Sequence, residues 1–183
     1  RPRFDDADLE APEALRLKPY ALALCGKFVF VRAAPDGPGL DEYLGATGDL
    51  LLRLSAGLGA RVDTLELSEL TNWKVAVENT LEFYHVGLIH RTSFAKLGAT
   101  EREHNFHGPH SQAVAAIPVD DNPRRRKLMD GIAARPFVCD GYLHQFVFPN
   151  LTVATTQGAS FSVQFFEPVA PGVEGARGPF RVI

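Results

Sequence analysis

The sequence has few of the features that would place it in a specialised class of protein. Its 183 residues include two cysteines, Cys25 and Cys139, which form no C-x-x-C pair. That excludes a disulfide framework and predicts two apolar thiols in a reducing compartment. The most apolar early stretch, residues 20–31, is interrupted by Lys27 and is too short to span a bilayer. Because no secretory signal pattern opens the chain, we expect a cytoplasmic protein without a membrane segment.

An excess of positive charge is also missing. The chain holds 19 Lys and Arg against 22 Asp and Glu, which gives a formal net charge of -3. This balance lacks the basic footprint of a nucleic-acid-binding protein, so we expect no nucleic-acid partner. Hydrophobic residues make up 45% and charged residues 22%, the composition of an ordinary globular protein.

Periodic patterns predict helices and strands in the first half of the chain. Residues 27–32 (KFVFVR) and 61–67 are expected to be strands because they are β-branched or alternate in polarity. Leucines at helical spacing after Thr47 predict a helix that stops near Gly57 and Gly59. The clearest helix is expected over 71–85, with Thr71 or Asn72 as its cap, Trp73, Val77 and Leu81 on its apolar stripe, and Gly87 as its stop.

The second half shows a different pattern. Residues 91–120 have no period and are expected to be loop, and Asn122-Pro123 predicts a basic helix to about residue 134. Three strands are expected over 142–148, 151–156 and 160–167. Scattered helices and strands followed by an antiparallel run favour an α+β fold.

The chemically informative segment is residues 72–90. On a helix, Asn79, Glu82 and His85 share one face, whereas His90 is offset from His85 by ~140°. The two imidazoles converge only if the helix ends between them, and Gly87 lies where that break is needed. Two histidines at a helix end with carboxylates one turn back suit a divalent first-row metal, with Glu82 as a partner for one ring nitrogen. A solvated or hydrogen-bonded helix end is the alternative for this spacing.

The same segment also resembles a known family. Its pattern N-W-K-x3-E-N-x2-E-x-Y-H-x4-H is similar to the mononuclear iron motif of the alpha subunit of Rieske-type aromatic-ring-hydroxylating oxygenases. Weaker likenesses to this family lie in residues 25–31 and 40–45, at the end of its Rieske module, and in residues 144–150 and 164–171, in its later strands.

The resemblance implies roles for the residues of the motif. His85 and His90 are implied to be two ligands of a non-haem Fe(II). Glu82 is implied to be the carboxylate that links this iron to a Rieske cluster on a neighbouring subunit. Asn79 is implied to be an outer-shell group near the iron, and Tyr84 to pack beside the ligand helix.

The resemblance also implies the architecture. The fold is expected to be a helix-grip (Bet v1/START-like) α+β domain, with a central antiparallel sheet and flanking helices. Residues 1–45 are expected to be the end of the Rieske module and the crossover, and residues 46–183 part of the catalytic non-haem iron domain. No residue matches the aspartate that is the family's third iron ligand, and the Cys and His ligands of the 2Fe–2S Rieske cluster are not in this chain. We therefore expect a chain truncated at both ends and inactive alone.

Without the family's late helix, one apolar face of the sheet is predicted to lack a cover. Phe146, Phe148, Phe161, Val163 and Phe165 are expected to form that face.

The function implied by the resemblance is that of a terminal oxygenase. Such a protein uses Fe(II) and O2 to hydroxylate a small aromatic compound, by monooxygenation or dioxygenation. Electrons are implied to come from NAD(P)H through a reductase or ferredoxin and the Rieske cluster. The expected assembly is a homotrimer or an α3β3 complex.

Two other functions stay open at this point. One is a non-catalytic helix-grip domain that binds a ligand without iron, and the other is a zinc-dependent hydrolase that uses the same histidines. His104, His107 and His110 are expected to lie in a loop rather than to bind metal. Asp130 and Asp140 are weak candidates for a third ligand. Pocket-lining candidates, for each of which core packing is the alternative, are Phe83, Phe94, Phe106 and Val153.

Overall fold

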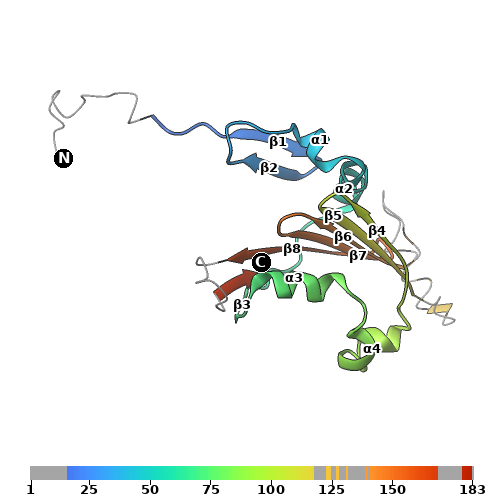
Figure 1. The fold of residues 1–183 in the computed structure, drawn as a ribbon. Helices are drawn as coiled ribbons and strands as arrows, with labels where there is room; N and C mark the ends of the chain where they lie inside the picture. Colours follow the sequence, from blue (N-terminus) through green and yellow to red (C-terminus); the bar gives the residue numbers. More distant parts are fainter. Residues whose placement is uncertain are drawn as a thin grey trace, which may run out of the picture.

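A computed structural model describes residues 16–117, 123–124, 127, 131, 139, 141–168 and 179–182. In this part of the chain, helices and two antiparallel sheets form the α+β arrangement drawn in Figure 1. The helical segments are α1 (Leu40–Leu44), α2 (Ala46–Gly57), α3 (Trp73–Leu81), α4 (Val86–Ile89) and the 3-10 turn η3 (Phe94–Leu97). The small sheet pairs β1 (Ala21–Cys25) with β2 (Phe28–Arg32).

The larger sheet has seven described strands in the order β3-β9-β8-β7-β6-β5-β4, each antiparallel to its neighbour. Their bounds are β3 (Leu67–Leu70), β4 (Thr100–His107), β5 (His110–Ala116), β6 (Gly141–Val147), β7 (Leu151–Thr156), β8 (Ser160–Pro168) and β9 (Pro179–Val182). The predicted strands of the second half are confirmed as β6, β7 and β8, which pair as consecutive hairpins.

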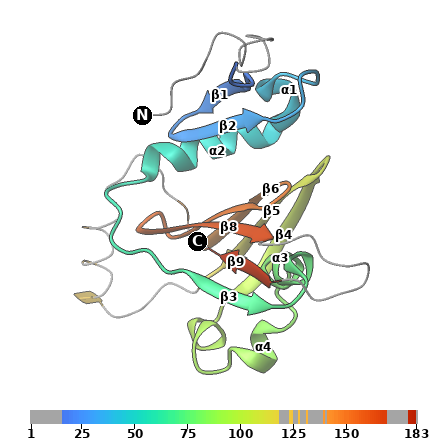
Figure 2. The same cartoon turned by 90° about the vertical axis from the view of Figure 1, so that its left-hand side faces the viewer.

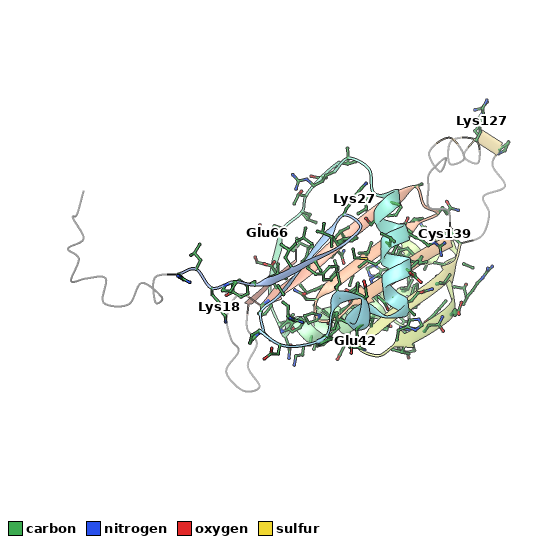
Figure 3. The ribbon with its side chains drawn as sticks, turned by 90° about the horizontal axis from the view of Figure 1, so that it is seen from above. Lys18, Lys27, Glu42, Glu66, Lys127 and Cys139 are labelled. Atoms are coloured by element: carbon green, nitrogen blue, oxygen red, sulfur yellow. The ribbon has the colours of Figure 1, made fainter. Side chains whose placement is uncertain are left out.

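Helix α2 covers one face of this sheet. Its buried leucines Leu51 and Leu54 pack with Leu143 of β6 and Val153 of β7, and Figure 3 shows the helix lying across the strands. The predicted leucine-rich helix is confirmed, but Gly45 rather than Thr47 stands at its N-cap. The β1–β2 hairpin packs on the opposite side of α2, where the Lys27 backbone N–H donates to Ser55 Oγ at 2.6 Å.

Helix α3 lies against the other face of the sheet (Figures 1 and 2). Val77 of α3 packs with Phe146 and Phe166, and Trp73 and Leu81 border this second core cluster. The two faces are therefore covered by different helices.

The prediction that five apolar side chains of the sheet share one uncovered face is wrong. Phe146 is buried on the α3 side, whereas Phe161 and Val163 pack against the cluster beneath α2. Phe148 is exposed and does not join them. In the sheet register Phe146 is level with Gln164 of β8, the neighbour of Val163 and Phe165, so Phe146 and those two side chains point to opposite faces.

Two predictions about extended segments are also wrong. Residues 61–66 have no regular structure, and the strand begins at Leu67, because β9 pairs only with Leu67–Leu70. Residues 91–120 are not simply loop, since β4 and β5 form a hairpin that turns at Gly108. β4 is an edge strand with few buried side chains, so its sequence carries no apolar alternation.

The predicted helix over 71–85 ends earlier, at Leu81. The predicted basic helix over 122–134 falls largely outside the described residues, as do Asp130 and Asp140. Among the helices that the structure describes, none has both the length and the apolar character needed to cross a membrane.

Candidate functional site

The segment that carries both candidate metal ligands is a helix, a break and a single helical turn. Asn72 caps α3, its Oδ1 accepting from the Lys74 backbone N–H at 3.0 Å, as the sequence predicted. At Glu82 the backbone becomes extended, with φ -101° and ψ 151°, so the helix stops. His85 then begins α4, and its carbonyl accepts from the N–H groups of Leu88 and Ile89.

This arrangement brings the two histidines together at opposite ends of α4. The ring centroids of His85 and His90 lie 5.1 Å apart, with the ring planes at 68°. A break was predicted at Gly87, but it lies between Leu81 and His85, and Gly87 is inside α4. The expected break between the two histidines is therefore wrong, because the rings of His85 and His90 converge across the single unbroken turn α4.

Glu82 and His85 are joined through both backbone and side chain. The His85 backbone N–H donates to Glu82 Oε2 at 3.1 Å, and the His85 ring Nδ1 contacts Glu82 Oε1. Desolvation raises the pKa of Glu82, but the hydrogen bonds and charge of His85 outweigh it and hold that pKa below its usual range. With Nδ1 engaged by a carboxylate, Nε2 is the nitrogen of His85 left to bind another group.

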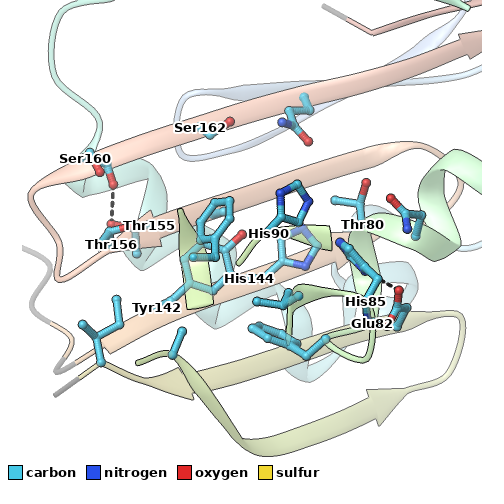
Figure 4. A pocket seen from close by; sticks show the side chains of 18 of the residues that line it. Thr80, Glu82, His85, His90, Tyr142, His144, Thr155, Thr156, Ser160 and Ser162 are labelled. Atoms are coloured by element: carbon cyan, nitrogen blue, oxygen red, sulfur yellow. Dashed lines mark hydrogen bonds and ion pairs between the residues drawn. The ribbon is translucent and has the colours of Figure 1, made fainter. Parts of the chain in front are cut away.

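A pocket of about 480 Å³ opens beside these residues (Figure 4). Asn79, Glu82, His85 and His90 line it from the helical side. β6, β7 and β8 supply the opposite wall. The polar residues of that wall are His144, Thr155, Thr156, Ser160, Ser162 and Gln164.

Aromatic side chains form much of the remaining pocket surface. Tyr142 stands in edge contact with Phe83, at 6.0 Å between centroids, and with Phe94, at 6.4 Å. His90 in turn meets Phe94 edge-on at 5.7 Å. A continuous aromatic surface therefore runs from the histidine pair to the sheet. The prediction that Phe83 and Phe94 line a pocket is confirmed.

Sequence reasoning missed the pocket role of Tyr142 and His144. Both belong to β6, whose alternate residues Leu143 and Gln145 face α2 instead. His144 is only 1% exposed, and burial followed by the charge of nearby His104 lowers its pKa to about 4. The predicted strand over 142–148 contained the signal that could have identified them, because residues two apart on a strand share one face.

Some sequence-based candidates lie elsewhere. Tyr84 is 87% exposed and does not pack beside the ligand segment, and Phe106 is 73% exposed. Val153 is buried in the core beneath α2. The alternative given for Val153, core packing, is therefore the correct one.

His104, His107 and His110 lie on strands β4 and β5 rather than in a loop. His110 is buried, with Nε2 donating to the Tyr43 carbonyl and Nδ1 accepting from the Phe148 N–H. His104 contacts Glu101 through Nδ1 at 3.2 Å. Within the described ranges, no group of three or more His, Cys, Asp and Glu side chains is arranged to hold a metal ion.

The residues present fit a mononuclear metal in part. Two neighbouring imidazoles, one fixed by a carboxylate on its other nitrogen, are the donor set that first-row metals such as Fe(II) accept. His85 and His90 both line the pocket, so a metal held by them would have coordination positions open toward it. His85 and His90 therefore suit two positions of such a site, with Glu82 as the group that orients His85.

Comparison with known proteins identifies the family of this chain. Residues 59–174 match the family described as ring hydroxylating alpha subunit (catalytic domain). A relative, the glycine betaine monooxygenase oxygenase subunit of Chromohalobacter salexigens, is 32% identical over 74 residues, which are 40% of this chain and 17% of that protein.

Solved structures share the fold. Quaternary ammonium Rieske monooxygenase CntA with an inhibitor superimposes with a TM-score of 0.65 at 15% identity, over 90% of this chain and 40% of that one. The complex of CntA with L-carnitine gives 0.59 at 17% identity, with the same coverage. The chain thus spans well under two thirds of the length of these relatives. The family match confirms the resemblance of the motif at residues 72–90, and the chain belongs to the ring-hydroxylating alpha-subunit family of Rieske non-haem iron oxygenases, within its catalytic domain.

Proposed function

We propose that this chain forms the iron-binding and substrate-binding part of a terminal oxygenase that hydroxylates a small organic compound. His85 and His90 hold a non-haem Fe(II), and Glu82 orients His85. When bound, the iron supplies the activation of O2. The observation that supports this most directly is the convergence of the two histidine rings beside a pocket, with one ring tied to a carboxylate.

The chain's own residues contribute placement and exclusion of water. Tyr142, Phe83 and Phe94 form an apolar wall next to His90, so a substrate seated on that wall lies close to the metal position. Asn79 borders the same space from α3 and is proposed as an outer-shell group. Such a wall lowers the local polarity and keeps the reacting part of a substrate away from bulk water.

We propose a small quaternary ammonium compound as the substrate. Aromatic faces attract a desolvated cation, and Glu82 is the charged side chain among the described residues that line the pocket. The relatives support this choice, since one is a glycine betaine monooxygenase and the CntA structures include a complex with L-carnitine. A small aromatic compound is the second candidate, because it would stack against the same rings.

Electron supply and assembly belong to the same proposal. Electrons come from NAD(P)H through a reductase or ferredoxin and a 2Fe–2S Rieske cluster, with Glu82 linking that cluster to the iron across a trimer interface. Residues 1–45 form the end of the Rieske module and residues 46–183 the catalytic part. β1, β2 and α2 share one core cluster, so under this proposal the two parts pack directly against each other.

The proposed iron site is tested by ferrous iron titration with nitric oxide as an EPR probe. We expect an iron–nitrosyl signal that is lost when His85→Ala and His90→Ala are combined. His107→Ala is the matched control, because His107 is not among the pocket-lining residues, and it should leave the signal unchanged. Survival of the signal in the double variant contradicts the proposal. A zinc-dependent esterase activity would favour a hydrolase instead.

A further inference from the structure

The imidazole of His144 is a buried polar group that is not fully paired among the described residues. Its Nε2 is buried and has no hydrogen-bond partner among the described residues, although the side chain is only 1% exposed. Leaving such a nitrogen unpaired in the interior costs about 1–3 kcal/mol. A buried group without a partner among the described residues points to a partner that comes from outside them.

Small side chains and the pocket surround His144. In the sheet register His144 lies between Ala113 of β5 and Ala154 of β7, and Ala154 in turn pairs with Ser162 of β8. On both neighbouring strands the imidazole is therefore flanked by the small side chain of an alanine. Figure 4 shows it within the pocket, between Tyr142 and the two candidate metal ligands.

The charges of the pocket-lining residues disfavour an anionic partner for His144. Among the described residues that line the pocket, none is Lys or Arg, and Glu82 contributes negative charge. His144 itself is uncharged near neutral pH, because burial lowers its pKa to about 4. A neutral imidazole pairs best here with an uncharged oxygen function such as a hydroxyl or a carbonyl.

A role for His144 as a third metal ligand does not fit. His144 lines the same pocket as His85 and His90, yet no three such side chains in the described part of the chain form a metal-holding group. His110 shows what a structural histidine looks like in this fold, since both of its ring nitrogens are paired within the protein. His144 is the opposite case, because it lines the pocket and its Nε2 has no hydrogen-bond partner among the described residues.

We propose that His144 Nε2 hydrogen-bonds a hydroxyl or carbonyl oxygen of the substrate and so selects among quaternary ammonium compounds. The inference rests on the proposed substrate class. The ammonium group lies against the wall of Tyr142, Phe83 and Phe94, and the oxygen reaches the imidazole of His144 beside Ala154. His144 is therefore a specificity-determining residue, which fixes which end of the substrate faces the metal position.

Calorimetric titration of the iron-free full chain with two matched cations tests the proposal. Choline carries a hydroxyl, and ethyltrimethylammonium is the same cation without it. We expect the wild-type chain to bind choline about tenfold more tightly, which corresponds to one net hydrogen bond. In His144→Phe the two cations should bind about equally, because choline binds more weakly while ethyltrimethylammonium binding is unchanged. His144→Gln should retain part of the preference for choline.

His107→Phe is the control for a histidine replacement outside the pocket, and it should keep the full preference. Should His144→Phe fail to fold, histidine-specific ¹⁵N labelling of the wild-type chain gives a second readout. The His144 Nε2 resonance, assigned by its absence in His144→Gln, should shift with choline and not with ethyltrimethylammonium.

The outcomes separate this inference from the proposed function. Equal binding of the two cations, or a choline preference that persists in His144→Phe, overturns the role of His144 alone. Binding of neither cation overturns it together with the quaternary ammonium substrate. The iron–nitrosyl experiment is unaffected by either result, because it uses no substrate.

Discussion

The carboxylate of Glu82 contacts His85 twice, accepting its backbone N–H at 3.1 Å and meeting its ring Nδ1. The first contact ties the residue after α3 to the residue before α4 and closes the break between them. The second sets the direction of the imidazole. One side chain thus controls both the bend of the backbone and the orientation of a candidate metal ligand.

Replacing Glu82 should weaken iron binding without unfolding the chain. Glu82→Gln removes the charge that holds His85, and Glu82→Ala removes both contacts, so we expect Fe(II) affinity to fall about 10–100-fold, more in the alanine variant. Titration with nitric oxide and EPR detection measures this. Glu78→Gln, an exposed carboxylate one turn earlier on α3, is the control and should bind iron like the wild type. Equal affinities in all variants would show that Glu82 does not orient His85.

The stability of the chain should fall as the pH drops from 7 toward 4, partly because of His144. The pKa of His144 is about 4 when folded against 6.5 unfolded, so the unfolded chain binds the proton more readily. The contribution is fully present above pH 6.5 and is lost as the pH falls through that window, by roughly 2–3 kcal/mol at pH 4.5. Urea unfolding of the wild type and His144→Gln at pH 7 and pH 4.5 checks this. An identical loss in both would contradict it.

His110 should be needed for stability rather than for binding. Its ring joins the Tyr43 carbonyl of α1 to the Phe148 N–H after β6, at 2.9 and 3.1 Å. His110→Phe keeps the ring volume but leaves both backbone groups unpaired, which should cost about 2–4 kcal/mol. Urea unfolding at pH 7 measures the loss, and His107→Phe should stay within about 0.5 kcal/mol. A variant as stable as wild type would mean that water replaces both bonds.

Two glycines should respond to alanine with opposite signs. At Gly141 a Cβ would lie 2.2 Å from the Ala115 carbonyl oxygen of the paired strand, so Gly141→Ala should cost roughly 3 kcal/mol. At Gly87 nothing lies within 4 Å, and alanine should stabilise α4 by up to about 1 kcal/mol. Thermal unfolding of both variants compares them. A tolerated Gly141→Ala would show that β5 and β6 can separate locally at this end.

Local sequence signals predicted much of the fold correctly. Asn72 caps α3, and the alternation in residues 142–167 identifies β6, β7 and β8, because turns and period-2 patterns are local properties. The hairpin of β4 and β5 was not predictable in this way. Its outer strand is exposed at the sheet edge, so no apolar pattern marks it.

The candidate site divides along the same line. The motif of residues 72–90 was sufficient to single out Asn79, Glu82, His85 and His90, and the family match bears out the resemblance that it carries. The position of the break was not predictable to the residue. Gly87 is the obvious helix stop in the sequence, yet the helix ends at Leu81, where the carboxylate of the next residue turns to His85.

By itself, then, the sequence determined the chemistry that this protein can offer: two imidazoles and a carboxylate in one short segment, and strands able to face them. Only the tertiary structure decided which side chains share the pocket. His144 faces the histidine pair because β6 pairs with β5 and β7 in one register, and a shift of one residue would turn it toward α2. That register is set by contacts between strands far apart in the chain, and a local pattern cannot encode it.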